Sequence, residues 1–472
     1  MRLSGGVSSV ILPPFQFPFL PPNPNPILPL MSDIQDAPKD AKGILKQLGP
    51  GLIVSANIVG SGELIVTTKL GADVGFILLW FIIFGCLIKV FLQVELGRYT
   101  LSKGKTALEA LNSVPGPKVG ASWLVWLWFL MFVATFFQLS GMVGGIAQVA
   151  GLAGSSFSDT SLAILITGSC AVLLFIGRYF FIEKFATSMI AFFTIFTIFA
   201  VLSLYWTDYG ITAQNIQAGL SFRLPDQFVI AFAAFGVIGV GAAELIYYPY
   251  WCLEKGYARH VGPDDGSEAW IERARGWMRV LKWDAFVSMV IYTGATVAFY
   301  LLGAAVLNGK NIGVTNDNLM INLSELYSTS FGVVGLWIFV IGAFTVLYST
   351  IFISTASNSR LATDFFHLLK LVKIDSEADR IRWTKVACVA LPALYCIFYL
   401  SVGKPVTLVT IGAVAQALML PFLSFAALYF LYYKTHEALR PPFTWVLFLW
   451  TSAVLMTTVG VFQLVKEIEK LG

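Results

Sequence analysis

Two short stretches combine paired glycines with a glutamate inside apolar sequence. The first reads Gly60-Ser61-Gly62-Glu63, and the second, residues 239–244, contains Gly241 and Ala243 and ends at Glu244. Each glycine weakens a helix by about 1 kcal/mol. An acidic side chain in the bilayer costs about 2.5–3.5 kcal/mol on insertion scales and usually faces a cavity or a partner. We predict that both stretches interrupt helices, and that Glu63 and Glu244 supply oxygen ligands for a metal cation or share a proton.

Simpler interpretations of these stretches stay open. Small residues allow close packing of membrane helices, although packing alone does not call for two glutamates. A carboxylate in the first turn of a half-helix can also stabilise the free amides there. Asn57, one turn before the first stretch, and Gln416, in a later apolar run, are further candidate substrate-binding residues. Other polar residues in apolar runs, including Gln138, Tyr247 and Ser354, are expected to form interhelical hydrogen bonds.

The composition restricts the class of protein that can hold these residues. Of 472 residues, 57% are apolar and 12% are charged, and the mean hydropathy is +0.76. Soluble proteins carry about 25% charged residues, which excludes a cytosolic enzyme, a nucleic-acid binder and a secreted disulfide scaffold. The apolar runs are too long and too uniform for a membrane barrel. The five cysteines form no CxxC pair and are expected to be core residues.

The apolar runs predict about eleven membrane-spanning helices. They lie at residues 50–71, 74–97, 122–150, 161–180, 186–206, 228–253, 284–307, 332–357, 385–402, 405–433 and 443–466. If the N-terminus is cytoplasmic, most of the 31 Lys and Arg residues flank the cytoplasmic side, as positively charged loops do. We therefore predict a multi-pass protein, in the plasma (inner) membrane, with a cytoplasmic N-terminus.

The two glycine-glutamate stretches fall in the first and the sixth predicted spans. We therefore expect two inverted repeats, at residues 49–206 and 228–433, followed by a last span within 443–472. Matching interrupted helices in inverted halves are typical of the central site of a secondary transporter. The segment 31–48 is expected to be cytoplasmic. In the long loop between spans 6 and 7, apolar residues from Trp270 to Leu281 recur at helical spacing with basic residues between them, which predicts an amphipathic helix at the membrane surface.

The first thirty residues are predicted to lie outside the fold. Prolines recur between Pro13 and Pro29, and this density favours a disordered tail over residues 1–30. Met31 follows immediately and opens a plausible N-terminal sequence, so translation starting at Met31 is an equal alternative.

Four short motifs carry a resemblance to a known family. They are Gly49-Pro50-Gly51 before the first span, Leu79-Trp80 in the second, Trp123-Leu124 with Trp126-Leu127 in the third, and Leu420-Pro421-Phe422 in the tenth. Over most of residues 48–433 the chain resembles the Nramp family of metal-ion transporters. This resemblance implies an all-α LeuT-type fold with a 5+5 inverted repeat, in which spans 1, 2, 6 and 7 rock against spans 3, 4, 8 and 9.

The substrate motifs of that family are largely replaced. Where the family has Asp-Pro-Gly-Asn in span 1, this chain has residues 60–63, and Met-Pro-His in span 6 corresponds to Ala243, Glu244 and Leu245. The thioether that favours transition metals is thus missing from that place. The acidic residues that the family links to proton movement in span 3 correspond to Phe136 and Leu139, which puts proton coupling by that route in doubt.

Two substrate classes follow from these departures. Glu63 and Glu244 would make an all-oxygen site suited to a divalent cation such as magnesium or manganese. Alternatively, Gly60-Ser61-Gly62 resembles the break of LeuT-type amino-acid carriers, whose free amides hold a small anion or an amino-acid carboxylate. In that case Glu63 would need a partner such as Lys89, unless Lys89 extends toward the cytoplasm.

The sequence predicts a secondary transporter and no enzyme. Neither a His, Asp or Cys cluster near the membrane surface nor a nucleotide-binding GxxxxGK[ST] loop is evident in the sequence. We expect no cofactor apart from a transported metal ion, no nucleic acid and no obligatory protein partner. The expected partners are the lipid bilayer and a small ion or solute.

Overall fold

The computed structural model describes residues 34–177, 179–225 and 229–469. The predicted tail at 1–30 and the predicted start at Met31 lie outside these residues. The regular elements of the described chain are helices, apart from a short hairpin of β1 (Lys118–Val119) and β2 (Ala121–Ser122). The helices of the first half are α1 (Ala41–Gln47), α2 (Pro50–Ile58), η2 (Ser61–Thr67), α3 (Thr68–Val74), α4 (Leu79–Lys103), α5 (Ala107–Asn112), α6 (Trp123–Leu152), α7 (Asp159–Ile176), α8 (Tyr179–Ser203), η3 (Leu204–Trp206) and α9 (Ala213–Gly219).

The second half contains the longest helices. They are α10 (Val229–Phe235), α11 (Ala242–Lys255), α12 (Tyr257–Val261), α13 (Glu268–Leu302), η4 (Gly303–Asn308), α14 (Leu319–Leu368), α15 (Glu377–Val402), α16 (Pro405–Tyr433), η5 (Glu437–Leu439) and α17 (Phe443–Glu469). Serines begin several of the spanning helices. The side chains of Ser122, Ser158 and Ser267 accept a backbone N–H from the first turn of α6, α7 and α13, respectively.

The predicted set of membrane spans agrees with these helices. Among the described residues, eight helices are long and apolar enough to cross a membrane, and a ninth span is the bent pair of α2 with residues 62–74. The two remaining predicted spans, at 186–206 and 228–253, correspond to α8 and to the interrupted pair α10 and α11. Each predicted span therefore has a helical counterpart.

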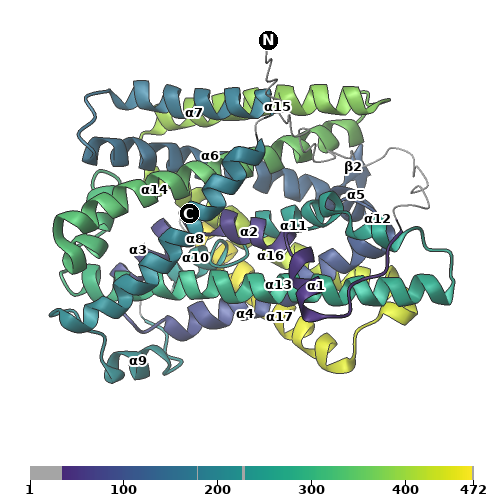
Figure 1. Ribbon diagram of the computed structural model, residues 1–472, viewed down its shortest axis with the longest axis horizontal. Helices are drawn as coiled ribbons and strands as arrows, with labels where there is room; N and C mark the ends of the chain where they lie inside the picture. The colour runs from purple at the N-terminus through teal and green to yellow at the C-terminus, as the bar shows by residue number, and fades with distance from the viewer. Residues whose placement is uncertain (1–33, 178, 226–228, 470–472) are drawn as a thin grey trace, which may run out of the picture.

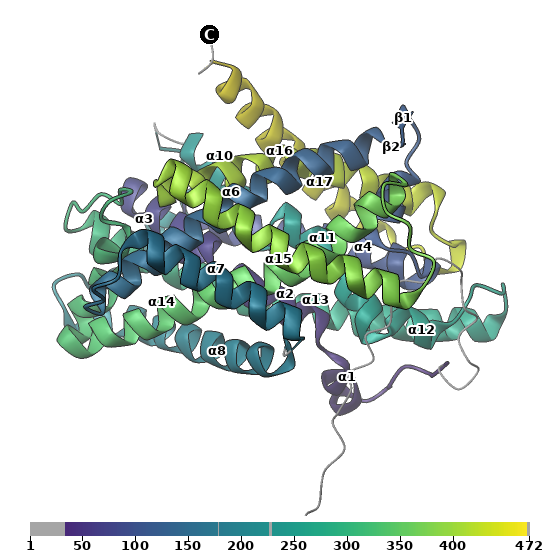
Figure 2. The same ribbon diagram turned by 90° about the horizontal axis from the view of Figure 1, so that it is seen from above.

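The spanning helices pack as two sets with α16 between them. In one set α13 packs on α4 and α2, and α11 packs on the same two helices. In the other, α6 packs on α14 and α15, and α7 packs on α15. In Figure 1, α7, α15 and α6 of the second set lie in the upper part, α13 and α4 of the first set lie in the lower part, and α2 and α11 lie between them. Figure 2, seen from above, shows α7 and α15 side by side on the near face.

Two predicted boundaries change in the structure. The segment 268–282 is not a separate surface helix, because it is continuous with the seventh span as the first part of α13. Its apolar face is covered by protein: Trp270 and Trp277 are buried, and Trp277 Nε1 donates to the backbone oxygen of Gln35 over 2.8 Å. The eighth span, predicted at 332–357, belongs to α14, which begins at Leu319. Gly332, with φ of 56°, interrupts α14 and separates its first part from the predicted span.

Candidate functional site

The first span is interrupted where the sequence predicts it. Helix α2 ends at Ile58, and the chain then bends by 42° before it continues as the π-helical η2 and then α3. Glycine is required at position 60, because a Cβ atom there would run into the side chain of Thr350 from α14. At Gly62 a Cβ would lie 2.8 Å from the backbone oxygen of Val237. The glycines thus let the first break approach both α14 and the second break.

The sixth span is also interrupted. Helix α10 ends at Phe235 and α11 begins at Ala242, and Gly239 between them has φ of 61°, a conformation that favours glycine. Gly241 caps α11, and a Cβ there would lie 2.5 Å from Glu244 Oε2 and 2.6 Å from Gln416 Oε1. The absence of a side chain at Gly241 therefore gives these two polar groups the room to meet the start of α11.

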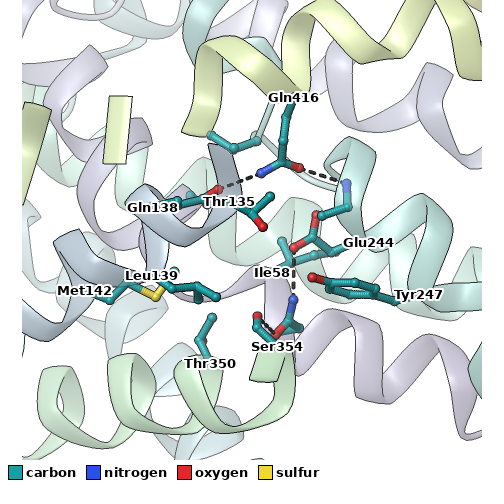
Figure 3. Close-up of a pocket in the computed structure, with 14 residues that line it drawn as sticks. Ile58, Thr135, Gln138, Leu139, Met142, Glu244, Tyr247, Thr350, Ser354 and Gln416 are labelled. Atoms are coloured by element: carbon teal, nitrogen blue, oxygen red, sulfur yellow. Dashed lines mark hydrogen bonds between the residues drawn. The ribbon is translucent and has the colours of Figure 1, made fainter. Parts of the chain in front are cut away.

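A cavity lies between the two breaks and the helices α6, α14 and α16. It encloses about 380 Å³ of space not filled by atoms, open solvent included. Figure 3 shows polar side chains converging on it from several helices. Its lining residues are Asn57, Ile58, Gly62, Thr135, Gln138, Leu139, Met142, Val237, Ala243, Glu244, Tyr247, Thr350, Ser354 and Gln416.

A chain of hydrogen bonds crosses this cavity from α14 to α11. Ser354 Oγ donates to Asn57 Oδ1 over 2.9 Å, and Asn57 Nδ2 donates to Glu244 Oε1 over 2.9 Å (Figure 3). Glu244 lies in the first turn of α11, where a carboxylate is favoured by the helix dipole. Asn57 thus links the first interrupted helix to the carboxylate of the second.

Gln416 of α16 closes the same cavity from another side. Its Oε1 accepts the backbone N–H of Ala243 over 2.9 Å, and its Nε2 donates to Gln138 Oε1 over 2.7 Å (Figure 3). Gln416 is 1% exposed, so these bonds satisfy a side chain that is cut off from solvent. This contact ties the N-terminus of α11 to α6 and α16.

Glu63 has a different environment from Glu244. Its Oε1 accepts bonds from the backbone N–H of Gly239 at 3.1 Å and from Thr296 Oγ1 at 2.9 Å, whereas its Oε2 is buried without a hydrogen-bond partner. Glu63 is not among the residues that line the cavity. Of the two predicted cation ligands, Glu244 therefore lines the cavity and Glu63 does not.

Lys89 of α4 does not extend toward the membrane surface. It is fully buried, and its Nζ donates to the backbone oxygens of Phe235 and Ile238, the latter over 2.7 Å. Both oxygens belong to the segment where α10 ends. Lys89 and Glu63 interact electrostatically, but no direct ion pair joins them in the described structure.

The structure brings together most of the residues that the sequence predicts. Asn57, Gly62, Ala243, Glu244 and Gln416 line one cavity. Gly241 and Gly60 act from outside it, because each gives a neighbouring side chain the room that a Cβ would fill. The predicted role of the Ser61 side chain lies outside what the structure describes.

Some lining residues were not singled out from the sequence. Thr135 and Met142 share one stripe of α6 with Gln138 and Leu139, at helical spacings of three and four residues. The helix is apolar on every side, so its hydrophobic pattern gives no direction. Gln138 could have identified both residues. Residues three or four positions from a buried amide lie on the same face of a helix as the amide.

The donor set suits a weakly held cation rather than a tight metal centre. Of the cavity-lining residues in the described chain, Glu244 alone carries a charge, and Asn57, Thr135, Gln138, Ser354 and Gln416 offer neutral oxygens. The described residues contain no cluster of three or more His, Cys, Asp or Glu side chains that could hold a metal. Carboxylate and amide oxygens are ligands of hard divalent cations.

A second cavity lies farther along α11, toward Lys255. It contains about 200 Å³ of space not filled by atoms, open solvent included, and is lined by Tyr247, Tyr250, Trp251, Glu254, Ser357, Arg360 and Leu361. Bonds between α11 and α14 surround it. Tyr247 donates to Asn358 Oδ1 at 2.5 Å and Arg360 pairs with Glu254 at 2.7 Å, while Asp364 accepts from Tyr250 at 2.7 Å and pairs with Arg380 of α15 at 2.8 Å.

Comparisons with known proteins agree with this architecture. The family described as "Natural resistance-associated macrophage protein-like" (Nramp) matches residues 51–466. Among solved structures, a manganese transporter mutant of Eremococcus coleocola superposes with a TM-score of 0.63 at 15% identity, covering 92% of this chain and 90% of that one. A comparison with curated protein sequences gave no match.

Two further solved structures are also similar to this chain. MhsT in complex with L-phenylalanine has a TM-score of 0.56 at 14% identity, covering 91% of this chain and 99% of that one. MHP1, a nucleobase-cation-symport-1 family transporter, has a TM-score of 0.53 at 13% identity, covering 91% and 95% of the two chains. At these identities the likeness shows the LeuT-type fold, as the sequence predicts.

Proposed function

The chain belongs to the Nramp family, and from this premise we propose that it is a secondary transporter that moves a divalent metal cation, such as manganese or magnesium, by alternating access. The cation binds in the cavity between the two interrupted helices. The structural neighbour from Eremococcus coleocola is described as a manganese transporter, which supports a metal as the substrate class.

The position of Glu244 is the single observation that carries this proposal. Its carboxylate is the only charged group among the residues that line the cavity in the described chain. It is partly buried in the interrupted sixth span, where a lone charge is unfavourable without a cation or other partner. One carboxylate surrounded by neutral oxygens binds a divalent cation and leaves it partly hydrated, so the cation can also leave.

The same carboxylate argues against an amino acid or small anion as the substrate. In that alternative the amides at the first break would hold a substrate carboxylate. Glu244 would lie in the same cavity and repel it. The alternative remains an outcome of the experiment below, because MhsT, with the same fold, was solved with L-phenylalanine.

The packing of the helices supports a rocking movement. Helices α11 and α13 each pack on α2 and α4, and α6, α7, α14 and α15 form the opposing set. The Arg360–Glu254 pair and the Tyr250–Asp364–Arg380 contacts join the sets beyond Tyr247. Breaking these contacts would connect the second cavity to the aqueous phase on that side, which is one half of an alternating-access cycle.

The remaining assignments follow from the charge distribution. We place the N-terminus, and the end of α11 that carries Lys255, in the cytoplasm, because the flanking loops there are basic. We further propose that the protein resides in the plasma (inner) membrane and that it works without an obligatory protein partner or a bound cofactor.

A transport assay with purified protein in liposomes tests the proposal. Uptake of Mn²⁺, Mg²⁺, L-amino acids and small anions is measured side by side for the wild type, for Glu244→Gln and for Glu325→Gln. Glu325 is a matched control, since it pairs with Lys310 away from the cavity. We expect Mn²⁺ or Mg²⁺ uptake that falls at least about tenfold in Glu244→Gln, equivalent to about 1.4 kcal/mol, and persists in Glu325→Gln. Uptake of an amino acid or anion with no metal uptake would overturn the proposal.

A further inference from the structure

The ammonium group of Lys89 occupies a site built from backbone oxygens at the end of a half-helix. It donates to the carbonyls of Phe235 and Ile238 and lies 4.4 Å from the centre of the Phe235 ring. The C-terminal end of a helix carries partial negative charge, and an aromatic face attracts cations. In transporters with interrupted helices, unwound carbonyls and the C-terminal ends of half-helices are where free monovalent cations bind.

The carboxylate of Glu63 completes this site from the other interrupted helix. Glu63 is fully buried, and its Oε2 has no hydrogen-bond partner. Its Oε1 accepts the backbone N–H of Gly239, the residue that follows Ile238, and the Ile238 carbonyl accepts the Lys89 ammonium, so both charged groups bind the same turn of backbone. Two carbonyls, an aromatic face and one carboxylate are a set of groups that would bind a small monovalent cation if no lysine were present.

We propose that the Lys89 ammonium is a tethered cation that fills a monovalent-cation site at the junction of the two interrupted helices. The side chain balances the charge of Glu63 and holds the end of α10 against α4. The carrier therefore needs no free sodium, potassium or ammonium ion at this place. Extension to the membrane surface, the ordinary role of a lysine in a spanning helix, is excluded because Lys89 has no exposed surface.

Replacing the side chain and supplying the cation from solution tests this inference. In Lys89→Ala the site is vacated, and the probes are methylammonium, sodium and potassium, with tetramethylammonium as a cation too large to enter. The first measurement is the thermal unfolding temperature of the purified protein at increasing concentrations of each probe, which needs no substrate. The second is Mn²⁺ uptake into liposomes, which rests on the proposed function.

The expected results differ between the variant and its control. Without a probe, Lys89→Ala should unfold at a lower temperature and lose at least about tenfold in uptake, because a buried carboxylate has lost its counter-charge. Methylammonium should raise its unfolding temperature and restore most of the uptake, whereas tetramethylammonium should do neither. Lys69→Ala is the control: Lys69 pairs with Asp73 within α3 and is partly exposed, so no probe should rescue it selectively.

A double variant covers the case in which Lys89→Ala does not fold. In Lys89→Ala with Glu63→Gln, the negative charge is removed with the positive one, so folded protein should be recovered and its stability should not respond to methylammonium.

Three results would overturn the inference. They are full uptake and stability in Lys89→Ala without any probe, a folded Lys89→Ala that no small cation stabilises, and loss of folded protein in both the single and the double variant. A wild type that transports no metal would defeat the proposed function instead, and the unfolding measurements would still decide the role of Lys89.

Discussion

The side-chain amide of Asn57 donates a 2.9 Å hydrogen bond to the carboxylate of Glu244. These residues lie on different interrupted helices, α2 and α11, and Ser354 of α14 extends the chain by donating to Asn57. The cavity is therefore organised by one amide that orients the only carboxylate in its lining. A cation that binds Glu244 also meets the Asn57 oxygen nearby.

Asn57→Ala should weaken both the fold and the transport. The substitution leaves Glu244 Oε1 and the Ser354 hydroxyl without their bonds, which costs about 1–3 kcal/mol for a buried group. We expect a lower unfolding temperature and a higher KM for Mn²⁺ uptake.

Asn57→Asp tests whether the substrate is a cation or an anion. It adds a second carboxylate beside Glu244 at nearly constant volume. Tighter binding of Mn²⁺, measured by calorimetry, is expected for a cation carrier. Tighter binding of an anion would contradict the proposed function.

Met142→Leu should change the choice between metals without changing the fold. Among the described residues that line the cavity, Met142 alone has a thioether, and it lies on the α6 stripe that also carries Gln138. Thioethers favour transition metals over magnesium, and Met and Leu have similar volumes, so the stability cost should stay below about 1.5 kcal/mol.

The measurement for this variant is Mn²⁺ uptake in competition with Mg²⁺. The ratio of the two uptake rates should shift toward Mg²⁺. Met278→Leu, on the part of α13 outside the cavity, is the control and should leave the ratio unchanged. An unchanged ratio in Met142→Leu would show that the thioether does not contact the cargo.

The Arg360–Glu254 pair should control access to the second cavity. It joins α14 to α11 with an N–O distance of 2.7 Å and is only partly exposed. Glu254→Gln removes one charge and should shift the equilibrium toward the state open on that side. Such pairs contribute about 0.2–1 kcal/mol, which limits the shift to about fivefold.

Cysteine labelling measures this shift. Ser357→Cys, in a cysteine-free background, places a thiol in the wall of the second cavity. Its rate of modification by a membrane-impermeant maleimide should rise when Glu254→Gln is added, and Glu325→Gln near the opposite side should not raise it. Equal rates in all three proteins would contradict a gating role for the pair.

Asp284→Asn should destabilise the start of α2. The Asp284 carboxylate of α13 accepts the backbone N–H groups of Gly49 at 2.8 Å and Gly51 at 2.6 Å, and the Tyr248 hydroxyl at 3.1 Å. In Asp284→Asn one of the two oxygens is replaced by an NH₂ group, which cannot accept a hydrogen bond from these donors. Hydrogen bonds to charged groups contribute about 1.5–3 kcal/mol each.

Thermal unfolding in detergent checks this prediction. The unfolding temperature of Asp284→Asn should be clearly lower than that of the wild type. Asp375→Asn is a suitable control, because Asp375 is 62% exposed and pairs only with Lys373 at the surface. If the two variants unfolded at the same temperature, the capping role of Asp284 would be wrong.

The sequence was sufficient to predict the spans, the two breaks and several cavity residues. Glycine pairs and buried polar residues at matching places are rare enough in apolar helices to be informative, and Asn57, Glu244 and Gln416 do line one cavity. The family resemblance and the LeuT-type fold are confirmed by the family match over residues 51–466 and by the solved structures.

The sequence could not give the directions of individual side chains. The π-helical winding of η2 alters which residues share a face after the break, and Glu63 meets Thr296 of α13 instead of lining the cavity. Lys89 was ambiguous because its carbonyl partners are backbone atoms, which carry no sequence signal. Met142 was missed since an apolar helix gives no preferred face.

Tyr247 is the single residue that belongs to the walls of both cavities. Its hydroxyl donates to Asn358, so the ring is held in a wall that the two cavities share. We expect this ring to limit the passage of ions from one cavity to the other. We expect shortening of this side chain to turn regulated exchange into channel-like conductance while leaving cargo recognition intact.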